Sequence, residues 1–152
     1  CYTDTGMRKW GRPYLTRKFF DILQETMRDD ILLVMAFDGE MPIASALNFI
    51  GSDALYGRNW GCVVHKPFLH FELCYYSGIE FAIAKGLQKY DAGAQGEHKI
   101  IRGFEPITTQ SLHWIQHPQF HGAIERFLQS EQASVQQHLQ QAREILPYRK
   151  TG

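Results

Sequence analysis

The sequence predicts an α+β domain in a three-layer arrangement of helices around a mixed sheet. Three observations predict it: three consecutive strand-like segments joined by tight turns, an apolar helix after them, and a short strand after that helix. A chain of 152 residues has the length of one domain and can bury about two thirds of its unfolded surface. We therefore expect a single domain over residues 1–152.

The first thirty residues are expected to contain a helix that follows a short lead-in. Residues 1–10 suit a short helical or irregular lead-in, which Gly11, Arg12 and Pro13 interrupt. Because proline is tolerated in the first turn of a helix, we expect a second helix over Pro13–Arg28. Its apolar residues recur at helical spacing and predict one buried face: Leu15, Phe19, Ile22 or Leu23, and Thr26 or Met27.

Three antiparallel strands follow. Residues 31–37 are continuously apolar, and Asp38-Gly39-Glu40 contains the Asp-Gly pair that favours a hairpin turn. A second turn is expected at 51–53. The predicted strands are therefore 31–37, 43–50 and 54–60.

A helix apolar on nearly every side is expected over Leu69–Leu87, after a loop at 61–68. We expect it to be buried against the sheet on one side and against something else on the other. Gly86 should end it. Its one early acid, Glu72, lies in the first turn, where the helix dipole stabilises a carboxylate by about 0.3–1 kcal/mol.

The last third of the chain is expected to contain two strands and a long helix. The strands are predicted at 89–92 and 106–114, and the helix at 118–146. One side of this helix is apolar and the other is rich in glutamine, and its length of about 40 Å exceeds what one domain needs. We expect its end to pack on a partner or on a missing part of the chain.

Composition limits the classes of function. A formal net charge of zero does not favour a generic nucleic-acid binder, which normally carries a basic excess. The three cysteines, Cys1, Cys62 and Cys74, lack metal-ligand spacing, so a reducing, cytoplasmic compartment is the simplest interpretation. The apolar runs are too short to cross a bilayer, and we expect no signal peptide. Because the chain opens mid-pattern with Cys1, we expect a fragment of a longer protein.

The stretch from Tyr90 to Phe104 concentrates glycine and ionisable residues. Three glycines within eleven residues allow sharp turns and a close approach to a ligand. Glu97, His98, Lys99 and Arg102 then supply an acid, an imidazole and two cations, a mixture suited to binding an anion and moving a proton. The alternative is a glycine-rich surface turn with solvated charges.

Two further stretches carry candidate site residues. Glu72 is a candidate general base, with an ordinary first-turn acid as the alternative. Arg58 and Gly61 lead from a strand towards a helix start, where backbone N–H groups bind anions; the alternative is an ordinary strand end. We expect Glu72, His98 and Arg102 to share one pocket. His70 and Glu72 are too poorly spaced to bind a metal together, so no metal site is predicted.

Several runs resemble a known family: Leu69–Tyr76, Asp91–Lys99, Arg102–Phe104 and His113–Ile115. They resemble the bacterial family named for peptidoglycan biosynthesis and recognition, whose members are described as predicted N-acyltransferases of the GNAT superfamily. The resemblance covers most of the chain. It implies a GNAT-like acyl-CoA N-acyltransferase fold, with a mixed, mostly antiparallel sheet flanked by helices. The chain is similar in layout to the C-terminal half of the Fem-type aminoacyltransferases, which carry two GNAT-like domains.

The resemblance also implies roles for individual residues. GNAT enzymes bind a cofactor pyrophosphate through an Arg/Gln-x-x-Gly-x-Gly/Ala loop, of which Arg58 and Gly61 are present, whereas Val63 replaces the small residue. Both acyl-CoA and aminoacyl-tRNA therefore remain candidate donors. Either one would act as a co-substrate and not as a tightly bound cofactor. The implied roles are catalytic for Glu72, Glu97 and His98, and donor-binding for Arg58, Gly61, Gln95, Gly96, Lys99 and Arg102.

Three functions stay open from the sequence. The first is transfer of an acyl or aminoacyl group to an amine of a small molecule or a peptidoglycan precursor. The second is a non-catalytic module that binds such a precursor or another anionic ligand. The third is assembly, for example a homodimer formed through the last helix.

Overall fold

The computed structural model describes residues 2–10, 12–93 and 96–148. The chain divides into two compact units, Cys1–Ala94 and Gln95–Gly152. Among the described residues, the first unit contains the sheet and six helical segments, all of which precede β4, and the second contains one short and one long helix.

The N-terminal part of the first unit is helical, as predicted. Helix α1 spans Tyr2–Trp10, α2 spans Arg17–Thr26, and the short 3₁₀ helix η1 spans Arg28–Asp30. Helix α2 begins at Arg17 and not at Pro13, so the predicted start is wrong. The reason is a tertiary contact, because the Leu15 N–H donates to the Tyr2 hydroxyl at 3.0 Å and holds this segment outside the helix.

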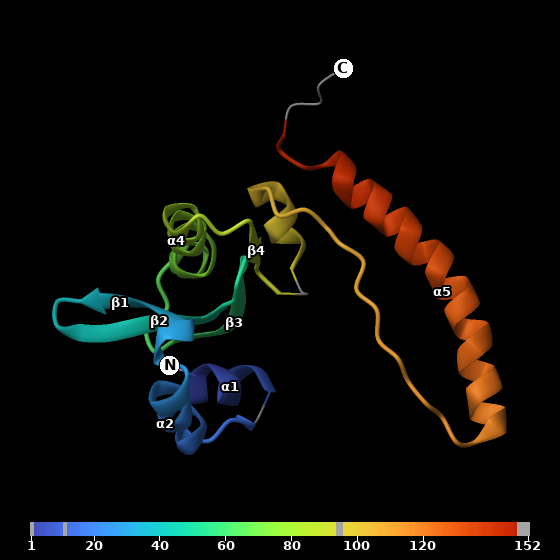
Figure 1. Cartoon of the computed structure of the whole chain (residues 1–152), viewed down its shortest axis with the longest axis horizontal. Coiled ribbons are helices and arrows are strands. Elements are labelled where there is room, and N and C mark those ends of the chain that lie inside the picture. Colours follow the sequence, from blue (N-terminus) through green and yellow to red (C-terminus); the bar gives the residue numbers. More distant parts are fainter. Residues whose placement is uncertain (1, 11, 94–95, 149–152) are drawn as a thin grey trace. The chain divides into compact units, whose positions relative to one another are not determined.

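The sheet has four strands in the order β1-β2-β3-β4 (Figure 1). The strands are β1 Ile31–Asp38, β2 Met41–Ile50, β3 Ala54–Cys62 and β4 Lys89–Asp91. The first three are antiparallel and β4 runs parallel to β3, so the predicted mixed sheet and its tight turns are confirmed. Gly39 has φ of +61°, the left-handed conformation expected of glycine in a hairpin turn.

A β-bulge interrupts the pairing of β2 with β3. Leu47 pairs with Asn59, whereas the next residue, Asn48, pairs with Gly57. Arg58 is therefore the extra residue on β3. A bulge of this kind bends the strand and changes the direction in which a side chain points.

One continuous helical segment covers one face of the sheet, with α1 and α2 on the other face (Figure 1). It comprises α3 Leu69–Phe71, the π-helical turn η2 Glu72–Tyr76 and α4 Ser77–Lys85, and it ends at Gly86 with φ of +69°, as predicted. Its Leu73 is buried with three residues of the strands: Ala44, Ala46 and Cys62.

The expectation that this segment is covered on both sides is wrong. Ile83 is 74% exposed and Tyr76 is 45% exposed, so its outer side faces solvent. Apolar composition alone cannot distinguish a helix buried on two sides from one that exposes part of its apolar surface.

The second unit contains η3 Glu97–Arg102 and α5 Pro118–Glu144, joined by an extended segment at 104–116. The predicted strand at 106–114 is wrong, because this segment has no strand partner among the described residues. Its apolar side chains are exposed: Ile107 by 70%, Leu112 by 100% and Trp114 by 83%. The alternating pattern suits an extended backbone, but a strand also needs a neighbour for its hydrogen bonds.

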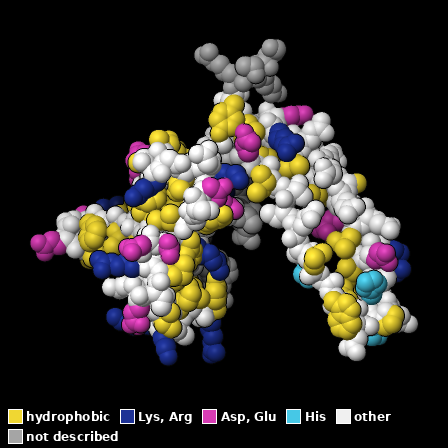
Figure 2. Space-filling model, in the orientation of Figure 1, with side chains coloured by type: hydrophobic (Ala, Val, Ile, Leu, Met, Phe, Trp, Pro, Cys, Tyr) yellow, Lys and Arg dark blue, Asp and Glu magenta, His cyan; other side chains and the backbone are white. Residues whose placement is uncertain are grey.

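The predicted long C-terminal helix is confirmed in α5. His117 precedes it, and its Nδ1 accepts the Phe120 N–H at 3.4 Å, so this histidine caps the N-terminus of the helix. Hydrophobic and histidine side chains lie together at this end of α5 (Figure 2). None of the helices in the described residues combines the length and the apolar character that crossing a membrane requires.

Candidate functional site

Four of the predicted site residues lie together on η3 in the second unit. Glu97, His98, Lys99 and Arg102 occupy this single short helix. The glycines that flank it, Gly96 and Gly103, have φ of +104° and +87°, so both ends turn through conformations that favour glycine. Gln95, the other donor-binding residue predicted here, lies outside the described residues.

The imidazole of His98 is held in a partly desolvated and positively charged environment. Partial burial lowers the pKa of His98 below its ordinary value of 6.5, and the charges of Lys99 and Arg102 lower it further. The side chain is still largely exposed. At neutral pH the ring is therefore predominantly uncharged and can accept a proton.

Backbone contacts determine where His98 lies. A Cβ added at Gly96 would lie 2.5 Å from Cε1 of the His98 ring, so the ring packs directly on this glycine. The Arg102 guanidinium donates through Nη1 to the His98 carbonyl at 2.8 Å. Sequence reasoning identified these residues but not the contacts between them.

Tyr148 contacts the C-terminal end of η3 in the second unit. Its hydroxyl donates to the Gly103 carbonyl, and a Cβ at Gly103 would lie 2.6 Å from that hydroxyl. This contact joins the end of η3 to the residues after α5. The sequence contained no signal for it, because the two residues are 45 positions apart.

In the first unit, Glu72 begins the π-helical turn η2. The Ser77 N–H donates to the Glu72 carbonyl, five residues earlier, which defines the widened turn. The Glu72 side chain is exposed. Phe68, just before the helix, has φ of +64°, which is uncommon for a bulky residue. Widened turns and strained residues of this kind are frequent at functional sites.

Tyr90 on β4 supports the same turn. Its hydroxyl donates to the Cys74 carbonyl and lies 3.3 Å from Oδ1 of Asn48. Burial, above all, raises the pKa of Tyr90, with smaller contributions from Cys74, Tyr75 and Asp91, so the phenol keeps its proton. Gly78 makes room for the ring, because a Cβ there would lie 2.6 Å from it. Sequence reasoning missed this residue.

Two backbone N–H groups of the stretch expected to bind a cofactor pyrophosphate are occupied. The Cys62 N–H donates to the Thr5 hydroxyl at 3.1 Å, and the Val63 N–H donates to the Ile43 carbonyl at 2.9 Å. Gly61 is buried and pairs with Ser45 on β2. These N–H groups are therefore used by the fold itself.

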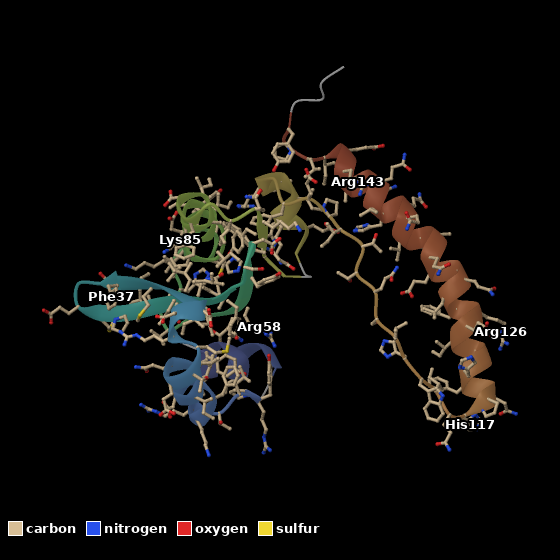
Figure 3. All side chains as sticks on the ribbon, viewed as in Figure 1. Phe37, Arg58, Lys85, His117, Arg126 and Arg143 are labelled. Carbon is tan, nitrogen blue, oxygen red and sulfur yellow. The ribbon has the colours of Figure 1, made fainter. Side chains whose placement is uncertain are left out.

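Arg58 extends towards the face of the sheet on which α1 and α2 lie (Figure 3). Its Nη2 donates to the Tyr14 hydroxyl at 3.0 Å. Anion binding by Arg58 stays a prediction, as does the pocket expected to be shared by Glu72, His98 and Arg102.

Cys62, Cys74 and His70 of the first unit have simpler surroundings. Cys62 is a buried free thiol and Cys74 is half-buried. The ring of His70 packs edge-on against Trp60 at 5.2 Å and Tyr75 at 5.4 Å. In the part of the chain that the structure describes, no three His, Cys, Asp or Glu side chains are grouped to hold a metal ion.

Comparison with known proteins identifies a family. The family model FemAB_like, described as "Peptidogalycan biosysnthesis/recognition", matches residues 1–150. No curated protein and no solved structure matches the chain significantly.

Proposed function

This chain belongs to the FemAB_like family of peptidoglycan biosynthesis and recognition, and from that membership we propose that it is an N-acyltransferase of GNAT-like fold. It transfers an acyl or aminoacyl group to an amine of a cell-wall precursor, in the cytoplasm. The observation that carries this proposal is the imidazole of His98, uncharged at neutral pH and adjacent to two cations on η3.

The reaction needs one base and a site for negative charge. The amine nitrogen attacks the donor carbonyl, the new C–N bond forms, and the C–S or C–O bond to the donor breaks. The proton of the attacking amine passes to the base and then to the leaving group. His98 suits this task, since its lowered pKa leaves the ring uncharged at neutral pH and able to accept the proton. Glu72 and Glu97 are the alternative bases.

The cations of η3 support binding of a phosphate-bearing donor. Lys99 supplies a compact charge and Arg102 a planar guanidinium. The occupied N–H groups of Cys62 and Val63 argue against the pyrophosphate loop of acyl-CoA enzymes at this position. This favours aminoacyl-tRNA, the donor of Fem-type enzymes, with acyl-CoA as the alternative co-substrate.

The proposal is tested by incubating the full chain with acyl-CoAs or aminoacyl-tRNAs and a muropeptide amine, and detecting the amide by mass spectrometry. Replacing the base, as in His98→Gln, should lower the rate by about 10²–10⁴-fold. Matched changes at exposed positions of α5, His138→Gln and Glu125→Gln, should leave it unchanged. If Glu72→Gln or Glu97→Gln abolishes transfer and His98→Gln does not, the base is that carboxylate. If no donor yields an amide, the proposal fails.

A second candidate function is a non-catalytic module that binds a cell-wall precursor. The occupied N–H groups of Cys62 and Val63 favour it, since these two donors are used by the fold and not by a cofactor phosphate. Calorimetry distinguishes the two functions: binding of a muropeptide without transfer from any donor would support the module.

A further inference from the structure

Helix η3 carries the candidate site but has no buried side chain to hold it in place. It is a 3₁₀ helix of six residues, Glu97–Arg102, and none of them is buried. Runs of 3₁₀ helix longer than three or four residues are uncommon, because their hydrogen bonds have poorer geometry than those of an α-helix. The conformation of η3 therefore depends on the contacts at its ends.

Backbone hydrogen bonds close the last turn of η3. The Gly103 N–H donates to the Ile100 carbonyl at 2.9 Å, and the Phe104 N–H donates to the Lys99 carbonyl at 3.2 Å. Gly103 has φ of +87°, so the chain leaves the helix through a left-handed residue, as is common at helix ends. This turn fixes the direction of the Gly103 carbonyl.

Tyr148 adds a contact from a distant part of the chain to this turn. Its hydroxyl donates to the Gly103 carbonyl. A Cβ built at Gly103 would lie 2.6 Å from that hydroxyl and 3.1 Å from Cζ of the ring, so the phenol packs directly on the glycine. Any side chain at position 103 would displace it.

The same turn places Arg102 beside His98. The Arg102 guanidinium donates through Nη1 to the His98 carbonyl at 2.8 Å, four residues earlier in the chain. Partial burial and the charges of Lys99 and Arg102 lower the pKa of His98. Opening of the turn at Gly103 would therefore move a charge away from the imidazole and expose the ring further.

We propose that Tyr148 is a positioning residue of the candidate site, which holds the Gly103 carbonyl and, through the last turn of η3, keeps Arg102 beside His98. The assignment rests on the proposed function, in which His98 accepts a proton and Arg102 binds the donor. It adds to the site a residue that lies after α5, 45 positions beyond Gly103.

The test compares the full chain with its Tyr148→Phe variant by NMR. This change removes the hydroxyl, keeps the ring, and leaves Glu97, Lys99 and Arg102 in the sequence. The pKa of His98 should rise towards 6.5, because burial of the ring and the nearby charge of Arg102 both decrease. The N–H protons of the turn at Gly103 should exchange about two- to tenfold faster, the effect of losing one hydrogen bond.

Three further variants separate positioning from general damage to the fold. Gly103→Ala disturbs the same contact from its other side, so it should also raise the pKa of His98. Gly39→Ala imposes a similar strain at φ of +61°, but nothing lies within 4 Å of its new methyl group. Gly39→Ala and Tyr56→Phe, a change at an exposed tyrosine of β3, should leave the pKa of His98 unchanged. Circular dichroism checks that each variant is folded.

An unchanged pKa of His98 in Tyr148→Phe would overturn the inference, even if this variant is less stable, because Tyr148 would then have a structural role only. An equal rise of the pKa in Gly39→Ala would overturn it as well, because a general loss of stability would then explain the change.

The outcome is separable from that of the proposed function. In the transfer assay, Tyr148→Phe should lower the rate by about ten- to a hundredfold, the effect of misplacing groups of the site. If the wild-type chain yields no amide from any donor, the proposed function fails, and the NMR titration still decides the inference. Amide formation at the wild-type rate in Tyr148→Phe would leave the transferase proposal standing and overturn the role of Tyr148.

Discussion

Replacing Gly78 by alanine should destabilise the first unit, although the same change normally stabilises a helix. Alanine is favoured over glycine inside a helix by about 1 kcal/mol. At Gly78, however, the new methyl group would lie 2.6 Å from Cε1, Cζ and Oη of Tyr90. Real Cβ atoms do not approach ring atoms so closely, so Tyr90 or the helix must move.

The magnitude follows from two costs. Overpacking of a filled site costs about 1–3 kcal/mol. Displacing Tyr90 also removes its hydrogen bond to the Cys74 carbonyl in the π-helical turn, which costs about 1–3 kcal/mol if the carbonyl stays buried. After subtracting the gain in helix propensity, we expect Gly78→Ala to lower the free energy of unfolding by about 1–5 kcal/mol.

Gly122 in α5 provides the matched control. A Cβ at Gly122 would meet only Nη1 of Arg126, at 3.5 Å, an ordinary contact at the end of a flexible side chain. Gly122→Ala should therefore stabilise α5 by about 1 kcal/mol.

Urea unfolding followed by circular dichroism measures both changes, and each is assigned to its own transition if the two units unfold separately. A Gly78→Ala protein as stable as the wild type would refute the packing of Tyr90 on the helix. Destabilisation by Gly122→Ala would refute the argument from propensity.

Four further predictions concern single residues. Tyr90→Phe should lower the free energy of unfolding by about 1–2 kcal/mol in urea titrations, because the Cys74 carbonyl loses its donor; unchanged stability would contradict that contact. Lys99→Met should raise the pKa of His98 in an NMR titration, because a nearby positive charge is removed, whereas an unchanged pKa would leave burial as the cause. The pKa of His98 is lowered in the folded state, so the folded protein disfavours protonation of this ring. The contribution of His98 to the free energy of unfolding is therefore present above pH 6.5 and is lost as the pH falls from 6.5 through the folded-state pKa. His98→Gln should therefore reduce the decrease in the free energy of unfolding that acidification causes. Gly96→Ala should shift the His98 ring signals and reduce stability, since it places a methyl group against the ring at a φ of +104°; unshifted signals would show that the ring lies elsewhere.

Much of the candidate site could be predicted because its residues are neighbours in the chain. Glu97, His98, Lys99 and Arg102 lie within six residues between two glycines, and local rules predict a tight polar turn there. The contacts that orient them were not predictable. The packing of His98 on Gly96 and the hydrogen bond from Tyr148 to the Gly103 carbonyl depend on conformations and distances that composition does not specify.

By itself, the sequence determined the features that depend on short-range chemistry. The Asp-Gly turn between β1 and β2, the end of α4 at Gly86 and the course of α5 each follow from a few adjacent residues. The tertiary structure alone decided the parallel pairing of β4, the π-helical turn that Tyr90 supports, and the lack of a strand partner for residues 106–114 in the described chain. The physical reason is that strand pairing and side-chain support need partners distant in the chain, and a local pattern does not identify those partners.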